Sequence, residues 1–173
     1  MIVGSGDFKY ELIENWGKLP EYFEMDDPVD IAVNSQDRVY VGSRGNHPVL
    51  IFDQDGKFIS CWGEGHFGDP HGVYIAPDDS VFITDRANNV VEKVAPGGQT
   101  KMTLGTRGVF RPMMLRQPFN QPTDLAVSPD MVMVVAPVLP AATLTKIRLP
   151  AVKVVQAGVG ATIMAFATPA STR

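Results

Sequence analysis

Apolar positions along the chain form short runs that recur with the same internal order. In each copy a proline leads an apolar stretch and a polar turn follows, and in the first two copies a second short apolar stretch comes next. The leading stretches are Pro28–Val33, Pro70–Ile75 and Pro122–Val127. Their spacing of roughly 40 to 50 residues is typical of the blades of a β-propeller, each of which is a small sheet of four strands.

The side chains in these runs predict strands and not helices. In residues 49–52 and 57–62 the apolar side chains are mostly β-branched or aromatic. Residues 53–57 between them are typical of a hairpin turn in which Gly56 supplies a positive φ. The two complete copies contain no convincing segment with a period of 3.6 residues, and a β-sandwich does not predict copies with matching landmarks. We therefore expect an all-β fold.

The copies are fewer than a closed propeller needs. Residues 28–105 hold two full blades, a third begins at Pro122, and a strand at residues 10–13 could complete another blade. Propellers usually close with at least four blades. We expect a partial β-propeller of about three blades over residues 8–130, whose exposed blade flanks favour self-association.

The composition changes abruptly after Asp130, which is the last acidic residue. Residues 131–173 are rich in Ala, Val, Pro and Thr, and Phe166 is their only aromatic residue. Loss of one charge class in mid-blade suggests a lost reading frame, so we expect a non-propeller tail that is frame-shifted or disordered; a genuine divergent tail is the alternative. Its apolar stretch, 154–170, is too short and too polar for a membrane helix.

The remaining composition narrows the function classes. The formal net charge is −4 with a pI of about 5.3, which argues against nucleic-acid binding. The first residues lack the basic region and apolar run of a signal peptide, so we expect no membrane association and a cytoplasmic location. The single cysteine, Cys61, cannot form an intrachain disulfide. Its place beside Trp62 in a predicted strand predicts a buried, inert thiol.

Two polar residues of the repeat, His71 and Arg44, suggest chemistry. His71 stands where the other copies have Val29 and Thr123, at the start of an innermost strand, so it could face the central channel or bond to a neighbouring backbone. Arg44, whose counterpart is Arg86, could bind a carboxylate at the same channel end or brace a turn. We interpret His47 and Asn89 as structural, and the spacing of His66 and His71 as a weak metal signal.

Several segments together resemble a known family. The copies resemble NHL repeats, with residues 88–91 in place of the signature. Residues 16–130 resemble the six-bladed propellers similar to peptidyl-α-hydroxyglycine α-amidating lyase. The matching segments are 39–47, which contain Arg-Gly-Asn-His, 70–73, which contain Pro-His-Gly, 83–85 and 119–127.

The resemblance implies both an activity and a site. Enzymes of that family bind zinc in the channel and a structural calcium beneath it, and they split a carbinolamide C–N bond to release glyoxylate and a peptide amide. By resemblance, His71 falls on a zinc ligand and Arg44 on the arginine that faces the substrate carboxylate. The backbone carbonyls of Ile31 and Val73 fall on calcium ligands. The implied substrate is a peptide or a small carbonyl-derived compound.

The chain also departs from the family pattern. The family's tyrosine should follow Asp130 closely, and further zinc histidines belong to later blades. We therefore expect an N-terminal fragment of a lyase-like propeller that is itself inactive and could bind neither metal. The alternative is a non-catalytic NHL platform that binds a peptide or protein, because a fold alone does not decide function.

Overall fold

The computed structural model describes residues 1–109, 119–127, 132–137, 148–149 and 152–154. These residues form strands and contain no helix, as the apolar pattern predicted. The strands are β1 (Ile2–Ser5), β2 (Phe8–Glu11), β3 (Pro28–Val33), β4 (Val39–Ser43), β5 (Val49–Phe52), β6 (Phe58–Trp62), β7 (Pro70–Ile75), β8 (Val81–Asp85), β9 (Val90–Val94), β10 (Thr100–Leu104), β11 (Pro122–Val127), β12 (Val132–Pro137), β13 (Arg148–Leu149) and β14 (Val152–Val154).

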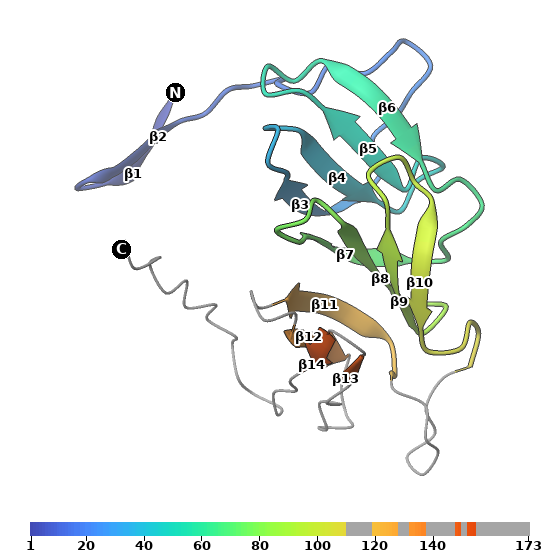
Figure 1. Cartoon of the computed structure of the whole chain (residues 1–173). Coiled ribbons are helices and arrows are strands. Elements are labelled where there is room, and N and C mark those ends of the chain that lie inside the picture. Colours follow the sequence, from blue (N-terminus) through green and yellow to red (C-terminus); the bar gives the residue numbers. More distant parts are fainter. Residues whose placement is uncertain (110–118, 128–131, 138–147, 150–151, 155–173) are drawn as a thin grey trace.

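Two of the sheets are regular propeller blades. The first blade has the strand order β3-β4-β5-β6 and the second β7-β8-β9-β10, and all neighbours in both are antiparallel. The strands β3, β7 and β11, which begin their sheets, lie side by side (Figure 1). These are the inner strands of a partial propeller, which confirms the predicted fold class.

The repeat also fixes how the strands pair. Pro28 lies opposite Ser43, Pro70 opposite Asp85 and Pro122 opposite Pro137, and each register shifts directly after the proline. Proline has no N–H to donate, so a bulge at the first residue of a strand is a place that tolerates it. The leading prolines seen in the sequence therefore mark equivalent bulges at the entrance of each inner strand.

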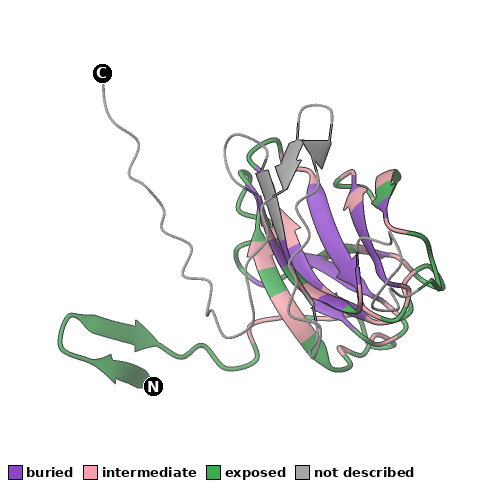
Figure 2. Cartoon of the chain, turned by 90° about the horizontal axis from the view of Figure 1, so that it is seen from below, coloured by how far each residue is buried: buried purple, intermediate pink, exposed green. Residues whose placement is uncertain are grey.

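The core lies between the blades, whose strands contain many of the buried residues (Figure 2). Tyr40, Val49 and Ile51 of the first blade pack against a group from the second that includes Val73 and Ile83. Between the second blade and the third sheet the packed residues are Ala76, Phe82, Val91, Leu104, Phe119, Leu125, Val127 and Val135. Stacking thus buries the faces that a single blade leaves exposed.

The N-terminal residues behave differently from the prediction. β2 pairs with β1 in a separate, exposed hairpin (Figure 2), so the expectation that residues 10–13 add a strand to a blade is wrong for the chain as described. Residues 16–25 instead pack on the outer face of the first blade, where Trp16 and Phe23 join a cluster with Leu50 and Phe52. Both faces of the β1–β2 hairpin are exposed, so its apolar residues carry no information about a partner.

The third sheet begins as a blade and then departs from the pattern. β11 and β12 pair antiparallel in the blade register, although β12 lies in the segment expected as tail. β12 then pairs with β14 in parallel, whereas the second and third strands of the regular blades are antiparallel. The domain boundary at residue 130 stays a prediction, and most of 131–173 lies outside the described residues. No helix long and apolar enough to span a membrane occurs in the part of the chain that is described.

Candidate functional site

Arg44 follows β4 and lies next to the entrance of the inner strand β3. His71 lies at the entrance of the neighbouring inner strand, β7. Arg44, just after β4, bonds to Asp27 (Nη1 to Oδ2, 2.5 Å) and to Asp69 (Nε to Oδ1, 2.8 Å). Arg86 of the second blade bonds to the other oxygen of Asp69 at 2.6 Å. The carboxylates of Asp27 and then Asp69 raise the pKa of Arg44, so the guanidinium stays charged and links two blades.

This ion-pair chain was missed in the sequence. The signal was present as Asp-Pro dipeptides before the first two inner strands, Asp27-Pro28 and Asp69-Pro70, each matched by an arginine after the second strand. The predicted roles of Arg44 were a turn brace or a carboxylate ligand, and the structure shows it already bonded to two carboxylates of its own chain. A substrate carboxylate would therefore compete with Asp27 and Asp69 for this group.

The geometry of His71 leaves one ring nitrogen for a ligand. Nδ1 lies 2.8 Å from the carbonyl oxygen of Thr123 on the next inner strand. A carbonyl only accepts, so Nδ1–H donates and the neutral ring carries its lone pair on Nε2. Metal-binding histidines commonly have this arrangement. The bond to a neighbouring backbone, left open as an alternative in the sequence, is present, and it is compatible with a ligand role.

Ile31 and Val73 occupy matching positions on adjacent inner strands. Their backbone amides donate to the two carboxylate oxygens of Asp30, Ile31 to Oδ1 and Val73 to Oδ2, each at 2.8 Å. Asp30 thereby joins the inner strands of the first two blades. The assignment of the two carbonyls to calcium stays a prediction.

The histidines do not gather around His71. His66 bonds to Glu92 at 2.7 Å and to Arg107, while His47 bonds to Glu64 at 3.0 Å. Catalytic zinc sites usually have three protein ligands. In the described chain His71 belongs to no group of three donors that could share an ion. The described residues thus supply one ligand of the implied zinc site, His71, and do not complete the site.

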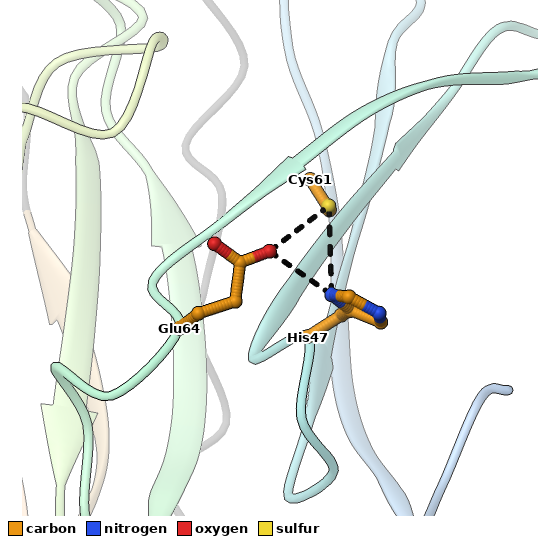
Figure 3. Close-up of side chains that lie close together, drawn as sticks. All are labelled: His47, Cys61 and Glu64. Carbon is orange, nitrogen blue, oxygen red and sulfur yellow. Dashed lines mark hydrogen bonds and ion pairs between the residues drawn. The ribbon is translucent and has the colours of Figure 1, made fainter. Parts of the chain in front are cut away.

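One group of three potential metal ligands does occur in the described part of the chain: His47, Cys61 and Glu64 (Figure 3). Cys61 Sγ lies 3.4 Å from Glu64 Oε1 and 3.7 Å from His47 Nδ1. Cys61 is half-buried, whereas the sequence predicted a buried thiol. The thiol is partly exposed because Cys61 lies on β6, the outermost strand of its blade. Burial and the neighbouring Glu64 raise the pKa of its thiol to about 11.

Sequence comparison reaches the same repeat family. The chain is 33% identical over 128 residues to NHL repeat-containing protein 3 of Homo sapiens, a match that covers 68% of this chain and 36% of that protein. It is 40% identical over 73 residues to peptidyl-alpha-hydroxyglycine alpha-amidating lyase 1 of Drosophila melanogaster, covering 42% of this chain and 13% of that protein. The chain is built of NHL-type β-propeller blades.

Structural comparison supports the fold of these NHL blades. Virginiamycin B lyase from Staphylococcus aureus superposes with a TM-score of 0.52 at 18% identity, covering 73% of this chain and 43% of that one. At this identity the likeness concerns the fold alone. No family model matches the chain. The NHL chain spans about a third or less of the length of these curated relatives.

Proposed function

We propose that the NHL propeller to which these blades belong is an amidating-lyase-like enzyme. It would cleave the C–N bond of an α-hydroxyglycine-extended peptide, giving a peptide amide and glyoxylate. The geometry of His71 carries the proposal, because its Nδ1–H is held by the Thr123 carbonyl and Nε2 is left as a ligand. The identity with the Drosophila lyase supports it.

Two residues would divide the work in this proposal. Arg44 would hold the carboxylate that leaves as glyoxylate, exchanging Asp27 or Asp69 for the substrate as it binds. His71 would provide one ligand for zinc, which would polarise the substrate hydroxyl when bound. His47 and His66 are bonded elsewhere, so they do not complete a zinc site with His71. We therefore propose that this chain by itself does not turn over the peptide substrate.

A second candidate function is a non-catalytic platform for a peptide or protein partner. The match to NHL repeat-containing protein 3 is consistent with it, since that name states repeats and no reaction, and the match extends over 128 residues. The engagement of Arg44 with two carboxylates of its own chain also favours it, because such a pair needs no ligand.

Peptide binding separates the two candidates. The purified chain is titrated with an α-hydroxyglycine-extended peptide and with the same peptide ending in an amide. Lyase-type recognition predicts that only the carboxylated peptide binds and that Arg44→Ala abolishes binding. Equal binding of both peptides, unchanged in Arg44→Ala, would instead support the platform.

The absence of turnover is tested with the same peptide. The chain is supplied with zinc and calcium, and glyoxylate is measured. We expect none. Zinc-dependent release that disappears in both Arg44→Ala and His71→Ala would show that this chain builds a working site, and would contradict the proposed inactivity.

A further inference from the structure

We propose that His47, Cys61 and Glu64 form a binding site for a divalent transition metal ion, with zinc as the best match. Cys61 lies on β6, the outermost strand of the first blade, Glu64 follows that strand, and His47 comes from the β4–β5 connection (Figure 3). The site uses neither Arg44 nor His71, so this proposal does not depend on the lyase proposal.

The distances between the donor atoms suit a tetrahedral ion. Zinc bonds of about 2.0–2.3 Å to nitrogen, oxygen and sulfur hold the donor atoms roughly 3.3–3.6 Å apart. The observed separations are 3.0 Å for His47 Nδ1 and Glu64 Oε1, 3.4 Å for Glu64 Oε1 and Cys61 Sγ, and 3.7 Å for Cys61 Sγ and His47 Nδ1. Small side-chain shifts therefore suffice to place one ion among all three.

The donor set identifies the class of metal. Imidazole nitrogen, thiolate sulfur and carboxylate oxygen together suit zinc and related divalent transition ions, whereas magnesium and calcium prefer oxygen alone. Three protein ligands leave a fourth position for water or another donor. Glu64 has 56% of its side chain exposed, so an ion can enter from solvent on that side.

The surroundings of the cluster hold two of its members in place. The ring of Phe23 stacks on His47 with centroids 4.2 Å apart and an interplanar angle of 14°. Phe23 and Cys61 belong to the apolar cluster on the outer face of the first blade, where Phe23 also meets Phe58. Packing of this kind fixes the orientation of ligands before the ion arrives.

The second blade shows that the fold does not require these residues. Its equivalent positions hold Asn89, Thr103 and Thr106. Asn89 accepts a hydrogen bond from the backbone amide of Gln121 at 2.8 Å, which is a structural role. All three positions carry metal-ligating side chains in the first blade, so the cluster is a property of this blade and not of the repeat.

Binding changes the protonation of the cluster in a defined way. In the metal-free chain Nδ1–H of His47 donates to Glu64, whose carboxylate also accepts from the thiol. On binding, the S–H bond breaks and its proton passes to solvent while the metal–sulfur bond forms. The His47 ring proton moves to Nε2, which frees Nδ1 to bind the ion.

Cobalt(II) provides a direct spectroscopic test. The purified, reduced chain is titrated with Co²⁺ and then with Zn²⁺. We expect saturation at one ion per chain, a thiolate-to-cobalt charge-transfer band, the visible absorption of tetrahedral cobalt, and displacement by zinc. Cys61→Thr should lose the charge-transfer band. His47→Asn and Glu64→Thr, which also introduce the second-blade residues, should each weaken zinc binding about a hundredfold or more, beyond the loss typical of a residue that only orients a ligand.

His66→Ala is the matched control, since it removes a histidine of the same propeller that bonds to Glu92 outside the cluster, and it should leave cobalt binding unchanged. Loss of the band in His66→Ala with retention in Cys61→Thr would overturn the proposal, as would the lack of saturable binding. A measurement on the unaltered chain covers the case of a variant that does not fold: zinc should slow alkylation of Cys61 by about tenfold or more, and an unchanged rate would count against the site.

Discussion

At the residue scale, the hydrogen bonds between Ser35 and Asp79 make the folding stability of the chain depend on pH in a defined direction. Asp79 accepts from the Ser35 amide at 2.9 Å and from its hydroxyl at 2.6 Å, which joins the inner hairpin turns of the two regular blades. These bonds lower the pKa of Asp79 from its ordinary 3.8. Because the folded-state pKa is the lower one, the stabilisation is complete above the ordinary value and is lost as the pH falls through the folded value.

We therefore expect Asp79→Asn to be less stable than the parent at neutral pH, with a difference that shrinks as the pH drops below 3.8. Asparagine tolerates the φ of 59° at this position, so the turn itself is kept. Urea unfolding at several pH values measures the difference. Asp37→Asn, at the equivalent turn position of the first blade with a φ of 57°, is the control. If the difference in free energy of unfolding between the parent and Asp79→Asn were equally large in acid, the proposed link between Asp79 protonation and stability would be contradicted.

Asp69 is expected to contribute more to folding stability than Asp79. Two arginines from different blades bond to it, and only 17% of its side chain is exposed. Asp69→Ala should lower the free energy of unfolding by about 1.5–3 kcal/mol, the usual range for hydrogen bonds to a charged group. Chemical denaturation measures the loss. Asp55→Ala, in an exposed turn, should have little effect, and equal effects of the two variants would show that the Arg44–Asp69–Arg86 contacts stabilise nothing.

Residues of this kind mark the limit of sequence reasoning about the site. Gly56 was correctly predicted to adopt a positive φ, since a hairpin turn demands it locally, and its φ is 80°. Asp27 and Asp69 were missed because their role depends on arginines from other strands. The cluster of His47, Cys61 and Glu64 was also missed, since residues 47 and 61 become neighbours only through pairing of β5 with β6.

At the element scale, Glu92 fastens β9 and β10 to the connections around them. Its side chain is 1% exposed and bonds to His66, Arg107, Thr100 and Thr103. The equivalent residue of the first blade is Leu50. Glu92→Ala removes the shared acceptor and should cost about 2–3 kcal/mol, since the remaining donors are only partly buried and can rehydrate.

A double-mutant cycle of Glu92→Ala and Arg107→Ala separates this network from simple loss of packing. We expect a coupling of about 1–3 kcal/mol, as for residues within one hydrogen-bonded network. Thermal or urea unfolding of the four proteins measures it. Additive effects would show that Arg107 does not depend on Glu92.

The strands themselves were largely predictable because the repeat supplies several copies of one pattern. Leading prolines, polar turns and β-branched runs located β3 to β8 and β11, and the same register recurs at every leading proline. The β1–β2 hairpin was not predicted as a separate unit, because apolar residues on an exposed hairpin look like those of a buried strand. The parallel pairing of β12 with β14 was unpredictable, since it breaks the repeat.

At the scale of the whole molecule, the inner strand of the first blade is left with an apolar face. Ile31 and Val33 are 62% and 55% exposed, whereas their second-blade equivalents, Val73 and Ile75, pack between blades. Residues 16–25 cover the outer strands of the same face through contacts with Val41, Leu50 and Phe52. The uncovered part carries apolar residues at positions that in the second blade pack against a neighbouring blade.

We expect this face to drive self-association, in which a blade of a second copy packs against β3. Sedimentation velocity over a range of concentrations should show larger species at high concentration, and more of them with sulfate, which strengthens apolar burial. Ile31→Ser with Val33→Ser should shift the equilibrium toward monomer by about tenfold or more, because two apolar side chains lose their burial at each contact. Tyr22→Ser, at a residue that is 91% exposed on the N-terminal segment, is the control and should associate like the parent. A parent chain that stays monomeric throughout, or association that persists in the double variant, would show that the exposed face of β3 does not form the contact.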